Sequence, residues 1–81
     1  MSRRYLLRSS RIRDVVDAHH LTHAAVARRL GLSRAYWSQL LNGHRALTPS
    51  TRRLLLDCPI FAGMTETELW ERIDVPEREA S

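Results

Sequence analysis

The sequence predicts an all-α fold, a compact bundle of about five short helices. Apolar residues recur at helical spacing in several short segments, and capping residues, glycines or prolines mark the ends of those segments. Neither the alternation typical of a half-buried strand nor an internal repeat is visible. With 81 residues, the chain can bury one core and cannot divide it into two.

The N-terminal residues 1–9 are expected to form a basic arm, because three arginines flank its short apolar stretch. This arm either packs on the body or reaches toward a phosphate backbone, and both uses stay open. A first helix is expected over residues 10–19. Ile12, Val15 and Val16 fall on the same stripe of that helix and give it one apolar side.

Two helices with a very short connection are expected next. Thr22 can cap the first, which covers residues 22–30, and Gly31 supplies the left-handed residue that ends it. Ser33 can cap the second, which covers residues 33–42. Helices joined this tightly must cross at a steep angle.

A fourth helix is expected over residues 49–58. Thr48 provides its cap, and Pro49 suits the first helical position because the amide hydrogen that proline lacks would be unpaired there anyway. Farther on, Thr65 and Glu68 have the spacing of a capping box. They predict the start of a fifth helix.

Residues 59–75 consist of an apolar connection followed by this fifth helix. The apolar side of the helix includes Leu69 and Trp70. With Phe61, these two side chains either close the core of the monomer or form a dimer contact, and the sequence is compatible with both uses. Residues 76–81 are polar and are expected to be a flexible tail.

Charge is distributed unevenly along the chain. Residues 1–56 carry 11 arginines and two acids, a net charge of +9, whereas residues 57–81 carry two arginines and seven acids, a net charge of −5. A basic body with an acidic end favours a polyanionic partner bound by the body. All 13 basic residues are arginines, which make planar, forked contacts with phosphate and guanine.

Several other classes of protein receive little support. Cys58 is the only cysteine, so a disulfide within the chain and a thiolate zinc cluster are excluded and a reducing, cytoplasmic setting is expected. His19 and His23 have a helical spacing, but Thr22 interrupts the helix between them, so we expect no metal site. We expect neither an enzyme nor a cofactor, because no nucleophile, base or phosphate-binding loop has a recognisable arrangement. No apolar run is long enough for a membrane span.

The predicted third helix has two unlike faces. At about 100° per residue, one face collects the apolar side chains Trp37, Leu40 and Leu41. The other collects Arg34, Ala35, Ser38, Gln39 and Asn42. A forked donor, a small residue, a hydroxyl and two amides are groups that pair with base edges in the major groove. An ordinary exposed face usually carries Glu and Lys pairs, and this one carries no acid.

These residues belong to a longer pattern that resembles the lambda-repressor and Cro family, also called the XRE family. The pattern covers residues 12–56 and consists of Leu21-Thr22, Ala27, Leu30-Gly31-Leu32-Ser33-Arg34, Leu40, Asn42-Gly43 and Arg45. The resemblance implies a helix-turn-helix DNA-binding domain over residues 10–58. It also implies that the second helix lies across the DNA backbone while the third enters the major groove.

The resemblance assigns roles to individual residues. Base-reading positions correspond to Arg34, Ala35 and Gln39, with Ser38 beside them. Phosphate-contacting positions correspond to Thr22, His23, Tyr36, Asn42, His44 and Arg45.

Four residues depart from the pattern. His23 stands where many members have Gln, and Trp37 fills a core position that is more often Ile or Val. Many members pair an Arg of the first helix with a Glu of the third, but the corresponding residues here are Val16 and Leu41. An apolar contact is expected to replace that ion pair.

The expected function is that of a transcriptional regulator, a repressor by the family's habit, that binds double-stranded DNA sequence-specifically in the cytoplasm, at the nucleoid. Because one recognition helix reads few base pairs, a homodimer on a palindromic operator is expected. The alternative is a protein-interaction module with the same fold, such as an antitoxin or an adaptor that holds a polymerase subunit or a phage protein. The sequence identifies no such partner protein.

Overall fold

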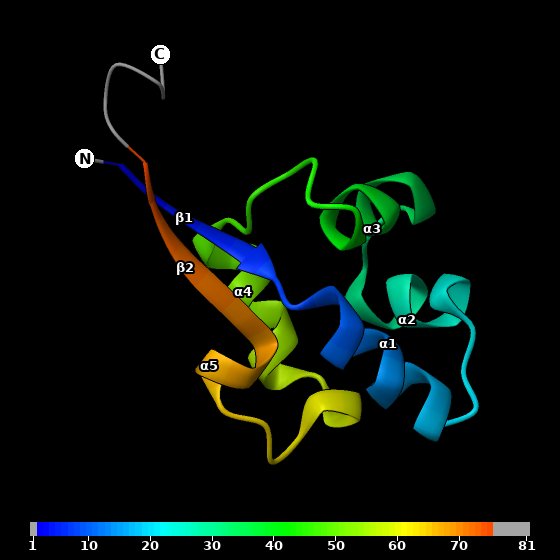
Figure 1. Ribbon diagram of the computed structural model, residues 1–81. Coiled ribbons are helices and arrows are strands. Elements are labelled where there is room, and N and C mark those ends of the chain that lie inside the picture. The colour runs from blue at the N-terminus through cyan, green and yellow to red at the C-terminus, as the bar shows by residue number, and fades with distance from the viewer. Residues whose placement is uncertain (1, 76–81) are drawn as a thin grey trace.

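The computed structural model describes residues 2–75 (Figure 1), so Met1 and the predicted flexible tail at 76–81 lie outside the described residues. In chain order, the elements are β1 (Ser2–Leu7), α1 (Ser9–Ala18), α2 (His23–Leu30), α3 (Arg34–Leu41), α4 (Pro49–Asp57), the 3-10 turn η1 (Pro59–Phe61), α5 (Glu66–Leu69) and β2 (Trp70–Val75). None of the helices among the described residues is long and apolar enough to cross a membrane.

Helices α2, α3 and α4 begin at the capping residues that the sequence indicates, whereas α1 has Arg8 at its N-cap position and no side-chain capping bond. The hydroxyl of Thr22 accepts the amide of Ala25 over 3.1 Å, and the hydroxyl of Ser33 accepts the amide of Tyr36 over 3.1 Å. Thr48 caps α4 in the same way over 3.2 Å. Each bond satisfies an amide that the helix leaves without a partner in its first turn. The prediction of a small, mostly helical fold is confirmed.

The expectation of an all-α fold is corrected by a two-stranded antiparallel sheet. β1 pairs with β2 in a register that runs from Ser2 opposite Val75 to Leu7 opposite Trp70. The predicted fifth helix is therefore wrong beyond Leu69, where the chain turns extended and α5 ends. In Figure 1 the two strands form a ribbon that projects from the helical body.

Cross-strand contacts explain why these segments are strands. Tyr5 lies opposite Arg72, and the same face of the ribbon carries the buried Leu7 and Trp70. On this face the guanidinium of Arg52, from α4, covers the Tyr5 ring with its carbon 4.0 Å from the ring centre. Pairing with β1 and burial of Trp70 at the base of the ribbon stabilise the segment as a strand. A helix over the same residues would not gain the cross-strand contacts.

The core lies between the helices and the base of the ribbon. Its largest fully buried side chains are Ile12, Val16, Val26, Trp37, Leu40, Leu55, Phe61 and Leu69. Val16 and Leu41 are both buried in this core, 2% and 8% exposed, so apolar residues occupy the positions of the family's ion pair.

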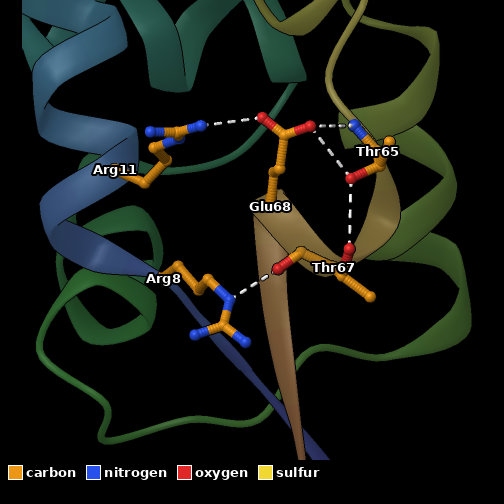
Figure 2. Close-up of polar contacts among 5 residues, drawn as sticks. All are labelled: Arg8, Arg11, Thr65, Thr67 and Glu68. Atoms are coloured by element: carbon orange, nitrogen blue, oxygen red, sulfur yellow. Dashed lines mark hydrogen bonds and ion pairs between the residues drawn. The ribbon is translucent and has the colours of Figure 1, made fainter.

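A polar cluster joins α5 to the N-terminal part of the chain (Figure 2). The Glu68 carboxylate accepts a hydrogen bond from Arg11 of α1 over 2.9 Å and from the backbone amide of Thr65 over 3.3 Å. Nε of Arg8 donates to the carbonyl oxygen of Thr67 over 2.6 Å. The predicted capping box of Thr65 and Glu68 is confirmed, and it doubles as a tie between distant segments.

Glu68→Gln should lower stability slightly and in a pH-dependent way. The Arg11 hydrogen bond, followed by the bonds from Thr65, lowers the pKa of Glu68 below its ordinary value of 4.5. A lowered pKa in the folded state means stabilisation that is present above the unfolded value and lost as the pH falls through the folded value. Urea unfolding should therefore separate wild type from Glu68→Gln at pH 7 and bring them together under acid conditions. An equal gap at both pH values would contradict this role.

Candidate nucleic-acid interface

A tight turn sets the angle between α2 and α3. Gly31 ends α2 in the left-handed conformation, with φ at 73°, which an L side chain rarely adopts. The amide of Leu32 then returns to the carbonyl of Ala27 over 2.9 Å, and Ser33 caps α3 at once. The connection therefore contains just three residues, and it fixes how α3 is presented to solvent.

The two faces of α3 separate as the sequence indicates. Trp37, Leu40 and Leu41 are buried, at 1%, 0% and 8% exposure. The opposite side exposes all four predicted base-reading residues, Arg34, Ala35, Ser38 and Gln39. These side chains lie on one exposed helical surface, which is the arrangement that a groove-reading helix requires.

Arg34 occupies a position that helix stability alone does not favour. It is the first residue of α3, and no acidic residue stands in that first turn. The N-terminal end of a helix carries a partial positive charge, which disfavours a cation by about 0.3 to 1 kcal/mol at an exposed site. An arginine here lowers the stability of the free helix and adds to its attraction for an anion.

The α2 N-terminus is joined to α3 through His23. The indole Nε1–H of Trp37 donates to Nδ1 of His23 over 3.2 Å, and their ring centres lie 6.5 Å apart. Because Nδ1 accepts this bond, the proton of the neutral ring is on Nε2, the nitrogen that remains to donate to a phosphate. Two of the departures from the family pattern, His23 and Trp37, are thus hydrogen-bond partners.

Arg13 is a further candidate residue that the sequence reasoning missed. It lines a pocket of 340 Å³ together with His23, Arg34 and Ser38, so a third element, α1, contributes to the surface around α3. Its position directly after the buried Ile12 places it on the flank of the apolar stripe, which was the only available signal. The pocket gathers two guanidinium groups beside the start of α2.

The remaining phosphate candidates lie at the end of α3 and in the loop after it. The amide nitrogen of Asn42 donates to the Ser38 hydroxyl over 3.4 Å, and the backbone amide of His44 donates to the carbonyl of Gln39 over 2.9 Å. Arg45 is exposed and folds back on α3. Tyr36 is half-buried, and Thr22 is exposed at the cap of α2.

The helices α2 and α3 carry basic side chains and no acid, whereas α1 places Asp14 and Asp17 beside Arg13 and His23 around a neighbouring pocket. Residues 18–56 contain six arginines and no acid. Among the described residues, Glu66, Glu68, Glu71 and Asp74 lie on α5 and β2. These acids therefore lie outside α2 and α3. The two helices themselves present no carboxylate that would repel a polyanion.

The three candidate dimer residues lie inside the monomer. Phe61, Leu69 and Trp70 are 2%, 0% and 6% exposed and belong to the core. Of the two uses that the sequence left open, closure of the core is the one observed. A dimer contact through these side chains would require the core to open.

Comparison with known proteins places most of the chain in one family. A family model described as a helix-turn-helix domain matches residues 5–58, from within β1 to just past the end of α4. Neither the curated proteins nor the solved structures gave a significant match. The family match agrees with the resemblance to the lambda-repressor and Cro proteins.

Proposed function

Because this chain belongs to the helix-turn-helix domain family, a class that binds DNA, we propose that it is a sequence-specific transcriptional regulator of the cytoplasm rather than an enzyme. The observation that carries this proposal is the exposed face of α3, where Arg34, Ala35, Ser38 and Gln39 stand together without an acid. In this proposal α3 enters the major groove of double-stranded DNA, and α2 crosses the backbone.

The proposed regulator is a repressor that binds a palindromic operator as a homodimer and blocks polymerase by occupying a promoter. The argument for two copies is that a single recognition helix reads few base pairs, so specificity needs two half-sites one or more helical turns apart. Since Phe61, Leu69 and Trp70 close the monomer core, the proposed dimer meets through other residues.

A second candidate is a protein-interaction module with the same fold. Leu54 and Leu56 of α4 are 40% and 38% exposed and would be its apolar contacts, although they lie about 200° apart on the helix and form two small apolar spots rather than one continuous patch. In this reading the basic surface around α3 is incidental. Salt dependence distinguishes the two candidates, because contact with phosphates releases counterions and contact through leucines does not.

Binding to duplex DNA should weaken linearly on a plot of log affinity against log salt, with a slope of about 0.9 for each phosphate neutralised. Arg13→Ala should reduce this slope by about 0.9, the value for one phosphate contact. The reason is that Arg13 lies with His23 and Arg34 around one pocket, where it can contact a phosphate. Arg11→Ala is the matched control, since Arg11 belongs to the same helix but pairs with Glu68 of α5. Binding that stays constant between low and moderate salt would favour the protein-interaction module.

A further inference from the structure

One side-chain pair on the candidate interface is explained neither by a base contact nor by a phosphate contact. Nε of Arg45 donates a hydrogen bond to Oε1 of Gln39 over 2.5 Å. Both residues are exposed, one on α3 and one in the loop that follows it. A guanidinium bound to an amide oxygen forms a charge-assisted bond, roughly twice as strong as a bond between neutral groups.

Arg45 is held on a second side by an aromatic ring. Its guanidinium carbon lies 5.6 Å from the centre of the Tyr36 ring, within the range of a cation–π contact. The Tyr36 hydroxyl is 3.5 Å from Oγ1 of Thr51, and Thr51 is buried. The loop turns at Gly43, with φ at 73°, and backbone hydrogen bonds hold it on both sides of Arg45, from His44 to Gln39 over 2.9 Å and from Leu47 to Tyr5 over 2.7 Å. The Tyr36 ring and the loop together restrict the position from which Arg45 binds Gln39.

This bond decides which end of the Gln39 amide is free. An unconstrained glutamine pairs with adenine by using both ends, since its amino group donates to N7 and its oxygen accepts the N6 amino group. In this structure the oxygen end of Gln39 already accepts from Arg45. The amino end remains to donate, and the guanidinium places further N–H donors beside the oxygen.

We infer that Arg45 is a positioning residue that fixes Gln39 as a hydrogen-bond donor and thereby makes it select guanine over adenine. The adenine amino group would approach Oε1 next to the guanidinium of Arg45, where two donors face each other. Guanine offers the acceptors O6 and N7 at the same edge. The inference rests on the proposed function, because Gln39 must face a base. It adds that this base is guanine.

The experiment begins with binding-site selection on random duplex DNA, using the full chain and Gln39→Ala. The base pair whose preference disappears in Gln39→Ala is the one that Gln39 reads, and wild type should prefer guanine there. Arg45→Ala should then lower the ratio of guanine to adenine affinity at this pair by about tenfold, a change within the range of one bidentate base contact. In the Gln39→Ala background, Arg45→Ala should leave that ratio unchanged.

Arg45→Lys separates positioning from charge. Lysine restores the positive charge and with it the affinity for random DNA, but it lacks the planar fork that stacks on Tyr36 and donates through Nε. The guanine preference should therefore stay low in Arg45→Lys. A pure phosphate contact predicts the opposite, since loss of such a contact weakens all sequences alike and lysine restores it.

NMR of the free protein tests the pair without DNA. The Arg45 Nε–H should exchange slowly with water in wild type and rapidly in Gln39→Ala. Rapid exchange in wild type, a wild-type preference for adenine, or no base preference lost in Gln39→Ala each overturns the inference while leaving DNA binding intact. A selection that recovers no sequence at all overturns the proposed function and the inference together.

Discussion

Truncation of the chain after Cys58 should yield an unfolded polypeptide rather than a folded monomer. The cut removes β2 and four core side chains, Ile60, Phe61, Leu69 and Trp70, each at most 6% exposed. Shortening one such side chain to alanine costs about 2 to 5 kcal/mol. Four together are comparable to the roughly 5 to 15 kcal/mol that stabilises a typical domain, so the helix-turn-helix should lose its shape. Circular dichroism during heating measures this directly.

Two controls isolate the cause. Truncation after Val75 removes only residues 76–81 and should preserve a cooperative melting transition. Trp70→Ala should cost about 3 to 5 kcal/mol, whereas Leu54→Ala, at a side chain 40% exposed, should cost far less. A cooperative transition in the chain cut after Cys58 would show that residues 59–75 are dispensable for the core and would make them available again as a dimer contact.

Arg34→Ala should reduce affinity for the selected operator while leaving affinity for random duplex DNA nearly unchanged. Arg34 is exposed at the first turn of α3, where its forked donor can pair with O6 and N7 of guanine. Loss of such a pair costs roughly 1 to 3 kcal/mol of discrimination. The measurement is the ratio of the two affinities at one salt concentration.

Arg72→Ala provides the matched control, because it removes the same charge from β2 instead of α3. It should leave the affinity ratio at the wild-type value. Arg34→Ala should also melt slightly higher than wild type, since a cation at the start of a helix opposes the helix dipole. An unchanged affinity ratio in Arg34→Ala would refute the assignment of this residue as a base reader.

The helical part of the fold is predictable because its signals are local. Thr22, Ser33 and Thr48 each bond an amide three residues ahead, so neighbouring residues identify the start of each helix. Gly31 marks the end of α2 for an equally local reason. The capping box at Thr65 and Glu68 is likewise predicted correctly, although α5 ends at Leu69.

The sheet was not predictable because its cause is not local. Trp70 and Ile73 are three positions apart, a spacing that places two residues on the same face of a helix. In a strand the same two residues point to opposite faces, so the local pattern favours a helix. Pairing with β1, at the other end of the sequence, decides between the two conformations. No pattern within either six-residue segment contains that information.

Part of the candidate interface is predictable from local sequence signals, and part depends on how the helices pack. The exposed face of α3 follows from helical periodicity, so Arg34, Ser38 and Gln39 are found from the sequence. The bond between Trp37 and His23 and the contribution of Arg13 depend on the packing of α1, α2 and α3. The base-reading and phosphate-contacting roles of all the candidate residues stay predictions.

The pairing of β1 with β2 also bears on the order of folding. Leu7 and Trp70 are neighbours across the ribbon, yet nearly the whole helical body lies between them in the chain. Contacts of such high contact order form slowly, because the entropy of closing the intervening loop is lost before any pairing is gained. Helix α2, its turn and α3 are held by contacts close in sequence. The helix-turn-helix should therefore assemble early, with the ribbon closing last and opening first.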